Sequence, residues 1–303
     1  MLFSQAKYFN ITKQIQMTES DVTKGLSQKL FKTIEKTQKS TSGFVNPYSQ
    51  GSNNPVYSAN GAFVICLRTD SKSVPASVVK RKTDIKVREQ ESQSGVKISK
   101  ADKDEIKEQI ISSMIASFPI DFIKTKYVYG IIYLKESLFV IDTSSDSDAE
   151  MINTLLRRVL GVFPVLEMES PSSPGAVMTS WLQDDANIPE EIEVQHECKL
   201  VDEADDKGPV VVCRKQDLFA EEVIAHIDAG KEVSMLQVLW NDSLEFKINS
   251  DLTISGIKLT DLMKEQLKED TGDGGMAKKF DAEVAIVVNN MRMLAPYIIE
   301  TFS

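Results

Sequence analysis

The sequence has few of the residues on which many enzymes and secreted proteins depend. Its 303 residues include three cysteines, Cys66, Cys198 and Cys213, and two histidines. Three widely spaced cysteines do not build a disulfide framework. No hydrophobic run approaches the roughly 20 residues that a transmembrane helix needs. The segment from Met1 to Lys13 also lacks the charged and then apolar order of a signal peptide. We therefore expect a cytoplasmic protein.

Motifs for nucleotide binding and catalysis are missing as well. There is no GxxxxGK[ST] loop and no GxGxxG after a predicted strand, so nothing supports nucleotide binding. The glycine-rich stretch 271–275 has neither the spacing nor the lysine of such a loop. Ser4 to Lys7 matches the SxxK pattern in form only, without its companion motifs. We expect neither enzymatic activity nor a cofactor.

Two groups of residues resemble metal ligands without the spacing that metal sites need. His196, Cys198 and Cys213 could supply three zinc ligands, but no Cys-x-x-Cys pair accompanies them. Acidic residues within 190–193 and 202–206 could in principle hold magnesium for a nuclease. They occur in short runs, however, where a solvated surface is the usual explanation. We expect no metal at either place.

Charge is distributed unevenly along the chain, whose net charge is −10. Residues 1–140 carry 21 Lys and Arg against 13 Asp and Glu, a net +8, whereas residues 141–303 carry 14 against 32, a net −18. Such asymmetry indicates one surface for a polyanion and another that stays in solvent. Uneven but purely solvated surface charge is the alternative, and charge alone does not choose between them.

The hydrophobic pattern predicts an α+β fold of mixed sheets and packed helices, without a βαβ rhythm or an internal repeat. Asn60-Gly61 between apolar flanks predicts a hairpin turn, and Gly161 predicts the end of a helix. Strands are expected at 7–15, 56–67, 127–134, 137–142, 209–213, 233–240, 244–257 and 282–288. Helices are expected at 18–39 (capped by Thr18 or Ser20), 146–160, around Trp181, at 220–229, near Leu262 and at the C-terminus.

The very charged region 75–118 predicts a projecting helical hairpin with a turn near 92–95. In its second arm Lys100, Lys103 and Lys107 share one helix face, which continues into Ile110 and Met114. A solvated arm whose apolar end packs on the body is the alternative. A Ser- and Pro-rich linker at 170–174 indicates a further boundary. We expect a central body (1–74 and 119–170), the hairpin as a tip (75–118) and an acidic base domain (171–303).

Several segments together resemble the recombination-associated RdgC family. The hairpin sequence from Ala59 to Arg68 and the segment Val74 to Lys80 match the family's pattern. The similarity is densest from Lys215 to Trp240 and covers nearly the whole chain in one order. Its remaining parts are Leu155 to Arg158, Leu160-Gly161, Thr179, Trp181 and Phe280 to Ala282.

The resemblance implies a homodimer shaped as a closed ring, with duplex DNA threading a positively lined hole. Binding would be largely independent of base sequence and would limit the access of RecA recombinase to DNA, which implies a nucleoid-associated protein. Single-stranded DNA is left open as a second ligand. Positive charge inside the ring would bind phosphates by releasing counterions, while an acidic exterior would discourage further DNA.

The expected sites follow partly from the resemblance and partly from charge. Arg214, Lys215 and Gln216 match a basic segment that faces DNA in the family, and Lys7 and Lys13 match basic positions of its first strand. The expected DNA contacts in the hairpin are Lys80, Arg81, Lys82, Lys100 and Lys103, and the expected apolar contacts of the dimer tip are Phe118, Phe122 and Met114. The proline at 119 departs from the family's pattern and leaves the tip residue open.

Two other classes of function compete with the DNA-binding ring. The acidic half could imitate DNA and inhibit a recombinase directly. A carboxylate-metal nuclease is the third class, although its carboxylates would have to converge from separate strands.

Overall fold

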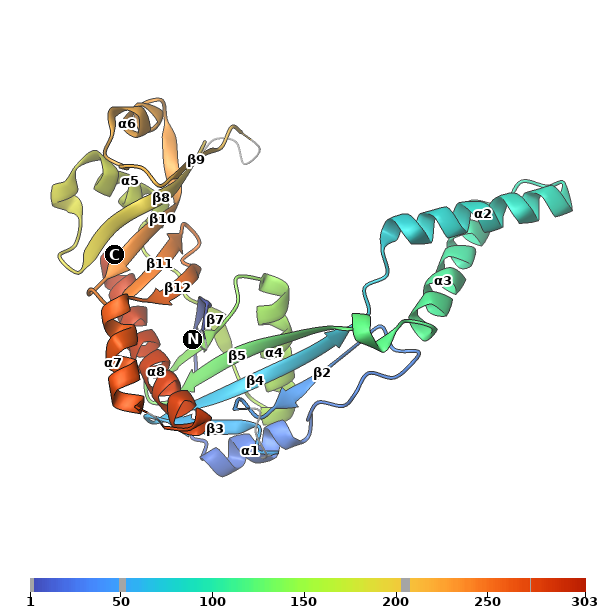
Figure 1. Cartoon of the computed structure of the whole chain (residues 1–303), viewed down its shortest axis with the longest axis horizontal. Coiled ribbons are helices and arrows are strands. Elements are labelled where there is room, and N and C mark those ends of the chain that lie inside the picture. The colour runs from blue at the N-terminus through green and yellow to red at the C-terminus, as the bar shows by residue number, and fades with distance from the viewer. Residues whose placement is uncertain (1–2, 49–52, 203–207, 273) are drawn as a thin grey trace. The chain divides into compact units, whose positions relative to one another are not determined.

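The computed structural model describes residues 3–48, 53–202, 208–272 and 274–303 (Figure 1). In this part of the chain, helices combine with antiparallel strands, which confirms the predicted α+β class. The chain divides into two compact units. The large unit comprises Met1–Gln28, Asn46–Cys66 and Val128–Ser303, and the small unit comprises Lys29–Val45 and Leu67–Tyr127.

The first half of the large unit is built around a short antiparallel hairpin and the strands beside it. Asn60 and Gly61 have positive φ angles of 47° and 76°, as a tight two-residue hairpin turn requires, so the predicted turn is confirmed. Its strands are β3 (Val56–Ala59) and β4 (Ala62–Ser71), followed by β5 (Lys124–Tyr133) and β6 (Leu138–Ile141). The strand β1 (Gln5–Ile11) pairs with β6, with β7 (Val165–Glu167) and with β12 (Ile254–Leu259).

Helices α1 (Glu19–Ser27) and α4 (Asp146–Leu160) pack against each other in this half. Thr18 caps α1 through a capping box with Asp21. The helices approach so closely at Gly25 that a Cβ there would lie 2.6 Å from the Leu160 side chain. A glycine is therefore needed at this crossing. The bounds of α4 agree with the predicted helix, and Gly161 ends it with a φ of 77°.

The second half of the large unit is an antiparallel sheet in the order β12-β11-β10-β8-β9. Buried Leu244, Phe246 and Ile248 alternate with half-buried residues along β11, as expected for a strand with one face in the core. The elements of this half are α5 (Pro174–Gln183), η2 (Asp185–Asn187), β8 (Ile192–Asp202), β9 (Val211–Arg214), α6 (Glu221–Asp228), β10 (Lys231–Trp240), β11 (Leu244–Asn249), β12, α7 (Asp261–Thr271) and α8 (Met276–Thr301). Helices α7 and α8 lie side by side (Figure 1).

The small unit contains the charged helical hairpin and the strand segments next to it. Helices α2 (Ala76–Ser94) and α3 (Lys100–Ala116) pack together, and the helical hairpin is confirmed. Gly95 ends α2 with a φ of 71°, and Ser99 caps α3. The unit also holds β2 (Ser40–Val45), the short helix η1 (Ile120–Phe122), the end of β4 and the start of β5.

Two predicted elements were wrong. The helix expected at 18–39 ends at Ser27, because Leu30 forms a bridge with Phe44 that draws the following residues to β2. The strand expected at 282–288 lies inside α8. Its β-branched residues favour a strand locally. However, Val284, Val287, Val288 and Met291 are all buried, and their spacing of three and four residues is that of one helix face.

Candidate nucleic-acid interface

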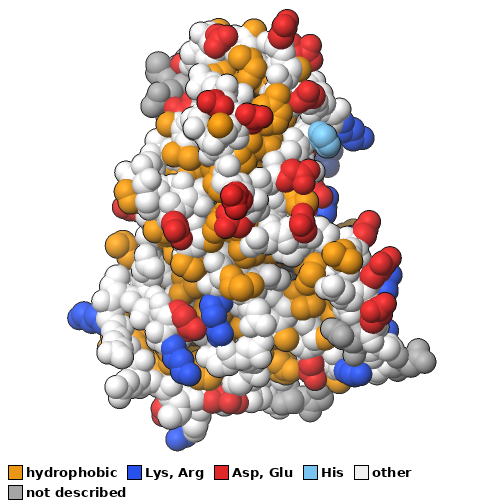
Figure 2. Space-filling model, turned by 90° about the vertical axis from the view of Figure 1, so that its left-hand side faces the viewer, with side chains coloured by type: hydrophobic (Ala, Val, Ile, Leu, Met, Phe, Trp, Pro, Cys, Tyr) orange, Lys and Arg blue, Asp and Glu red, His pale blue; other side chains and the backbone are white. Residues whose placement is uncertain are grey.

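The two compact units have opposite net charge. The small unit carries 17 Lys and Arg against 10 Asp and Glu, a net +7, and the large unit carries 18 against 35, a net −17. Figure 2 shows the face at the left of Figure 1, where acidic side chains are spread widely over the upper part and basic ones are few. The charge asymmetry of the sequence is thus also an asymmetry between structural units.

Within the small unit, the strand segments carry more of the excess positive charge than the helical hairpin does. Residues 76–116 hold 9 Lys and Arg against 7 Asp and Glu, whereas segments 29–45, 67–75 and 117–127 hold 8 against 3. Of the DNA contacts predicted from the sequence, those that fall in this unit are all on the hairpin, and none is on these segments. The sequence did contain an indication of this positive charge, because positions 29 to 39 hold four lysines and one glutamate. The missed cations are Lys29, Lys32, Lys36, Lys39, Lys124 and Lys126.

The predicted cations of the hairpin are exposed on its helices. Lys80, Arg81 and Lys82 are consecutive in α2 and exposed, so they point in three directions about 100° apart. Lys100 and Lys103 are exposed on one face of α3. Acidic residues Asp102, Asp104, Glu105 and Glu108 lie between and beside them, so this face has a mixed charge.

The predicted basic segment of the large unit lies at the end of β9. The Arg214 side chain is 70% exposed, and its Nε lies 3.3 Å from Oε1 of Glu197. The same oxygen lies 2.8 Å from the Lys247 Nζ. The hydrogen bond from Lys247, together with the charge of that lysine and of Arg214, lowers the pKa of Glu197. Lys215 is exposed with a φ of 56°, and Gln216 is half-buried. The cluster therefore keeps an excess of positive charge at the surface.

The two predicted cations of the first strand have different surroundings. The Lys7 side chain is 7% exposed and pairs with Asp146 and, at 2.9 Å, with Glu167. Burial alone would lower the pKa of Lys7, but its hydrogen bonds to the two carboxylates outweigh burial and raise it. Its charge is thus already neutralised within the protein. Lys13 follows the end of β1 and is exposed.

The predicted tip residues lie around η1 in the small unit. Phe122 is 71% exposed and Ile120 is 82% exposed, whereas Phe118 and Met114 are half-buried. A cavity of about 580 Å³ lies between α2 and α3, lined by apolar side chains such as Val79 and by lysines. An exposed apolar turn and an apolar cavity are thus present in the same unit.

The described residues contain no candidate metal-binding cluster, and two of their buried cysteines have raised pKa values. No cluster of three or more His, Cys, Asp or Glu there could hold a metal ion. Glu203, Asp205 and Asp206 of the acidic run at 202–206 lie outside the described residues. Burial raises the pKa of Cys66 and of Cys198 to about 12, which keeps these thiols protonated and unreactive. None of the described helices is both long and apolar enough to span a membrane.

The fold and the charge distribution define an α+β protein with a cationic unit and a strongly acidic one. A family model described as "Putative exonuclease, RdgC" matches residues 1–303. The recombination-associated protein RdgC of Colwellia psychrerythraea is 31% identical over 303 residues, covering 100% of this chain and 97% of the relative. That of Pseudomonas fluorescens (strain Pf0-1) is 30% identical over 301 residues, covering 99% and 96%. The chain belongs to the RdgC family, a family of recombination-associated proteins.

The description of the family model and the names of the relatives differ about enzymatic activity. The family model's description includes an exonuclease, whereas the names of the relatives mention recombination and no enzymatic reaction. The described residues offer no carboxylate cluster of the kind that metal-dependent nucleases use.

Proposed function

We propose that this protein binds double-stranded DNA independently of sequence, as a homodimeric ring that encloses the duplex and limits the access of RecA recombinase. The observation that carries the proposal is that the small unit has a net positive charge, with many exposed cations, whereas the large unit has a strong net negative charge. A cationic surface binds DNA by releasing counterions and does not read its sequence. An acidic unit repels further DNA and so favours one duplex per ring.

The proposed phosphate contacts are a chosen set of exposed cations from both units. In the small unit they lie on the hairpin and, on the basis of the structure, also on the start of β5. Lys7 is left out of the set, because its ammonium is paired with two carboxylates. The proposed set is Lys13, Lys80, Arg81, Lys82, Lys100, Lys103, Lys124, Lys126, Arg214, Lys215 and, as an uncharged donor, Gln216.

A two-fold ring needs two different contacts, each pairing with its own copy. We place one of them at the tip, where Phe122 and Ile120 expose most of their apolar surface. The apolar cavity between α2 and α3 has room for an aromatic side chain from a second copy. Association through this contact would remove two apolar side chains from water in each protomer.

The proposed effect on recombination follows from the occupation of duplex DNA by this protein. A protein that coats duplex DNA without sequence preference competes with any other protein for the same phosphates, which suits the family's association with recombination. The role needs no catalytic group. We therefore propose a non-enzymatic, nucleoid-associated protein.

The DNA-binding proposal is tested by fluorescence anisotropy with a short duplex of arbitrary sequence across a salt series. We expect a steep loss of affinity with salt that does not change when the sequence is scrambled. The double variant Arg214→Ala/Lys215→Ala removes two proposed phosphate contacts from each protomer, four from the ring, and should reduce the slope of log K against log salt by about four. Lys278→Ala/Lys279→Ala is the matched control, because these two lysines are exposed in the acidic unit. Absence of duplex binding at low salt would refute the proposal.

The tip contact is tested by measuring the molar mass in solution by light scattering. Phe122→Asp should shift the protein from dimer towards monomer, or towards an open dimer that dissociates from circular DNA more readily. The control is Val96→Asp, since Val96 is 67% exposed in the turn of the same hairpin. If both variants keep the wild-type mass and the wild-type lifetime on circular DNA, the tip contact is wrong.

The net −17 of the large unit favours one second candidate, an acidic DNA mimic that binds a recombinase directly. It predicts inhibition of strand exchange without duplex binding, relieved when the acidic unit is neutralised. Magnesium-dependent shortening of DNA ends would instead favour the exonuclease in the family description.

A further inference from the structure

The cavity between α2 and α3 is lined by residues of the small unit alone. On α2 its apolar and neutral wall is formed by Ala76, Val79 and Thr83, and on α3 by Ile111 and Ile115. These residues follow one another at spacings of three or four, which places them on one face of each helix. The two helices thus present a largely apolar wall to a cavity of about 580 Å³. Both the volume and the apolar lining are typical of sites for small molecules.

The charged residues of the lining are mostly lysines. Lys39, Lys72, Lys80 and Lys107 contribute to it, against one carboxylate, that of Asp84. All of these lysines except Lys72 are exposed, as lysines are when the stem packs on an apolar wall and the ammonium stays in water. Four lysines against one aspartate give the described lining a net charge of +3. The cavity therefore favours a ligand that carries a negative charge.

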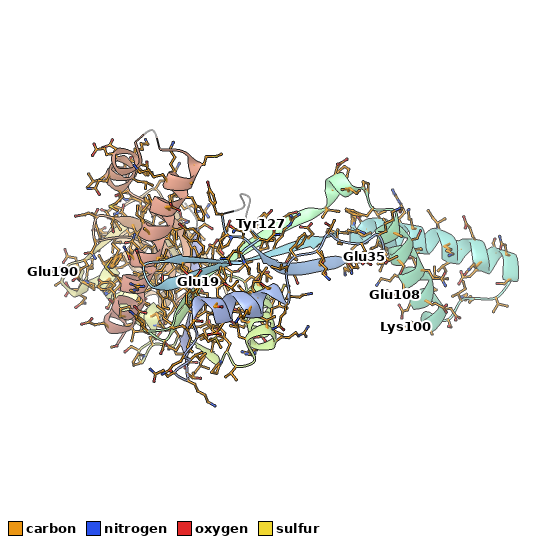
Figure 3. All side chains as sticks on the ribbon, turned by 90° about the horizontal axis from the view of Figure 1, so that it is seen from below. Glu19, Glu35, Lys100, Glu108, Tyr127 and Glu190 are labelled. Carbon is orange, nitrogen blue, oxygen red and sulfur yellow. The ribbon has the colours of Figure 1, made fainter. Side chains whose placement is uncertain are left out.

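The buried ammonium of Lys72 keeps its full positive charge beside the cavity. Its N–H groups donate to the carbonyl oxygens of Glu35, Lys36 and Ile115, which are neutral acceptors. The residue is 4% exposed, so water and salt screen this charge little. An anion in the cavity would interact with it more strongly than with an exposed lysine. Glu35 and Glu108 mark this part of the small unit in Figure 3.

The start of α2 is a second source of positive potential. Ser73, Val74 and Ala76 line the cavity around the first residue of this helix. The N-cap residue, Pro75, makes no side-chain hydrogen bond to the first turn, and that turn holds no acidic residue. The N–H groups and the dipole at a helix N-terminus attract anions. In α2 no acidic side chain of the first turn offsets this attraction.

We propose that this cavity binds a small molecule with an anionic head group and an apolar body, such as a medium-chain carboxylate. The body packs between Val79 and Ile111, and the head group takes the positive potential of the lysines and of the start of α2. The apolar wall distinguishes this ligand from DNA, whose backbone offers phosphates without an apolar chain.

The site itself is independent of the proposed function, but its consequence for the ring rests on that function. A bound amphiphile fills the space that we assign to an aromatic side chain of a second copy. Its binding would therefore open the tip contact of the ring.

The site is tested by isothermal titration calorimetry with decanoate, decyl phosphate, decanol and decyltrimethylammonium, each below its micelle concentration. We expect saturable binding of the two anions at one site per protomer. The uncharged and cationic compounds should bind more weakly, because only the anions gain from the lysines. Comparison of the two anions shows which head group the site prefers. Absence of binding by both anions, or equal affinities for anionic, neutral and cationic compounds, would overturn the site.

Variants of the lining locate the binding. Lys39→Gln/Lys107→Gln removes two lysines that are not among the proposed DNA contacts, and it should weaken decanoate binding about 2- to 30-fold, the range for the loss of two exposed charge interactions. Lys32→Gln/Lys97→Gln is the matched control, because both lysines are exposed in the same unit but outside the lining. Ile111→Trp fills part of the cavity and should prevent binding, with circular dichroism as the check on folding. Equal losses in the two lysine double variants would overturn the site.

The consequence for the ring is measured by light scattering and by the lifetime on circular DNA. Saturating decanoate should change the wild type in the direction expected for Phe122→Asp, and that variant should still bind decanoate. If Phe122→Asp opens the ring and decanoate does not, the competition is wrong. If neither changes the mass or the lifetime, the proposed tip contact fails and the competition with it, while the calorimetry still decides whether the site exists.

Discussion

Replacing Lys72 by methionine removes a buried ammonium and keeps most of the volume of the side chain. The Lys72 Nζ donates to the carbonyl oxygens of Glu35, Lys36 and Ile115 at 2.8, 2.6 and 3.3 Å. Lys72 itself is 4% exposed. The Ile115 carbonyl lies in the last turn of α3, where the helix dipole favours a positive charge. The ammonium thus connects the segment before β2 to the end of the hairpin.

The size of the effect follows from these three bonds. A hydrogen bond to a charged group contributes about 1.5–3 kcal/mol, and burying an ammonium costs several kcal/mol. When the cost of burial is subtracted from the contribution of the three hydrogen bonds, a net stabilisation of a few kcal/mol remains. We therefore expect Lys72→Met to lower the free energy of unfolding by about 2–4 kcal/mol.

Urea denaturation followed by circular dichroism measures this free energy, and amide hydrogen exchange in α3 shows where the loss occurs. The control is Lys39→Met. Both Lys39 and Lys72 line the cavity between α2 and α3, but Lys39 is exposed. A change within about 0.5 kcal/mol is expected there. The salt slope of DNA binding should not change in Lys72→Met, since this ammonium does not face solvent. Equal stability of the two variants would refute the reasoning.

Three further predictions concern the large unit. The lowered pKa of Glu197 means that its pairing with Lys247 stabilises the fold above the ordinary carboxyl pKa of about 4.3 and is lost as the pH falls below it. Glu197→Gln should therefore lower the melting temperature at pH 7 and have little effect near pH 3; an equal loss at both pH values would contradict this. Gly25→Ala places a methyl 2.6 Å from Leu160. It should lower the free energy of unfolding, measured by urea titration, by about 1–3 kcal/mol. An unchanged free energy of unfolding would mean that α1 and α4 separate freely. The burial that raises the pKa of Cys66 to about 12 should keep this thiol unlabelled by iodoacetamide at pH 8 until guanidinium is added, so rapid native labelling would disprove its burial.

The sequence by itself determined the elements whose signals are local. Asn60-Gly61 specified a hairpin turn because a tight turn of this kind needs positive φ angles that Asn and Gly adopt readily. The helix at 146–160 was predicted with its observed bounds, and Gly161 was the local signal for its end. The charge imbalance was also visible, since it only requires counting.

Local signals failed where distant residues decided the outcome. The run from Ala282 to Val288 contains valines and an isoleucine and was predicted as a strand, but α8 buries one helical face of it. Predicted helix residues beyond Ser27 leave the helix because Phe44 provides a bridge for Leu30. In both cases contacts with another part of the chain, a β-bridge at Leu30 and burial in α8, outweigh a propensity of a few tenths of a kcal/mol per residue.

The candidate site depends still more on tertiary structure. Lys7 and Lys13 are equivalent cations in the sequence, yet the fold places two carboxylates around Lys7 and leaves Lys13 exposed. Lys39, Lys72 and Lys107 are far apart in the chain and line one cavity only in the folded small unit. The sequence determined that this protein is an α+β member of the RdgC family with a cationic and an acidic part. Only the tertiary structure decided which cations are exposed and which are buried in ion pairs, because burial and ion pairing depend on residues that the fold brings together.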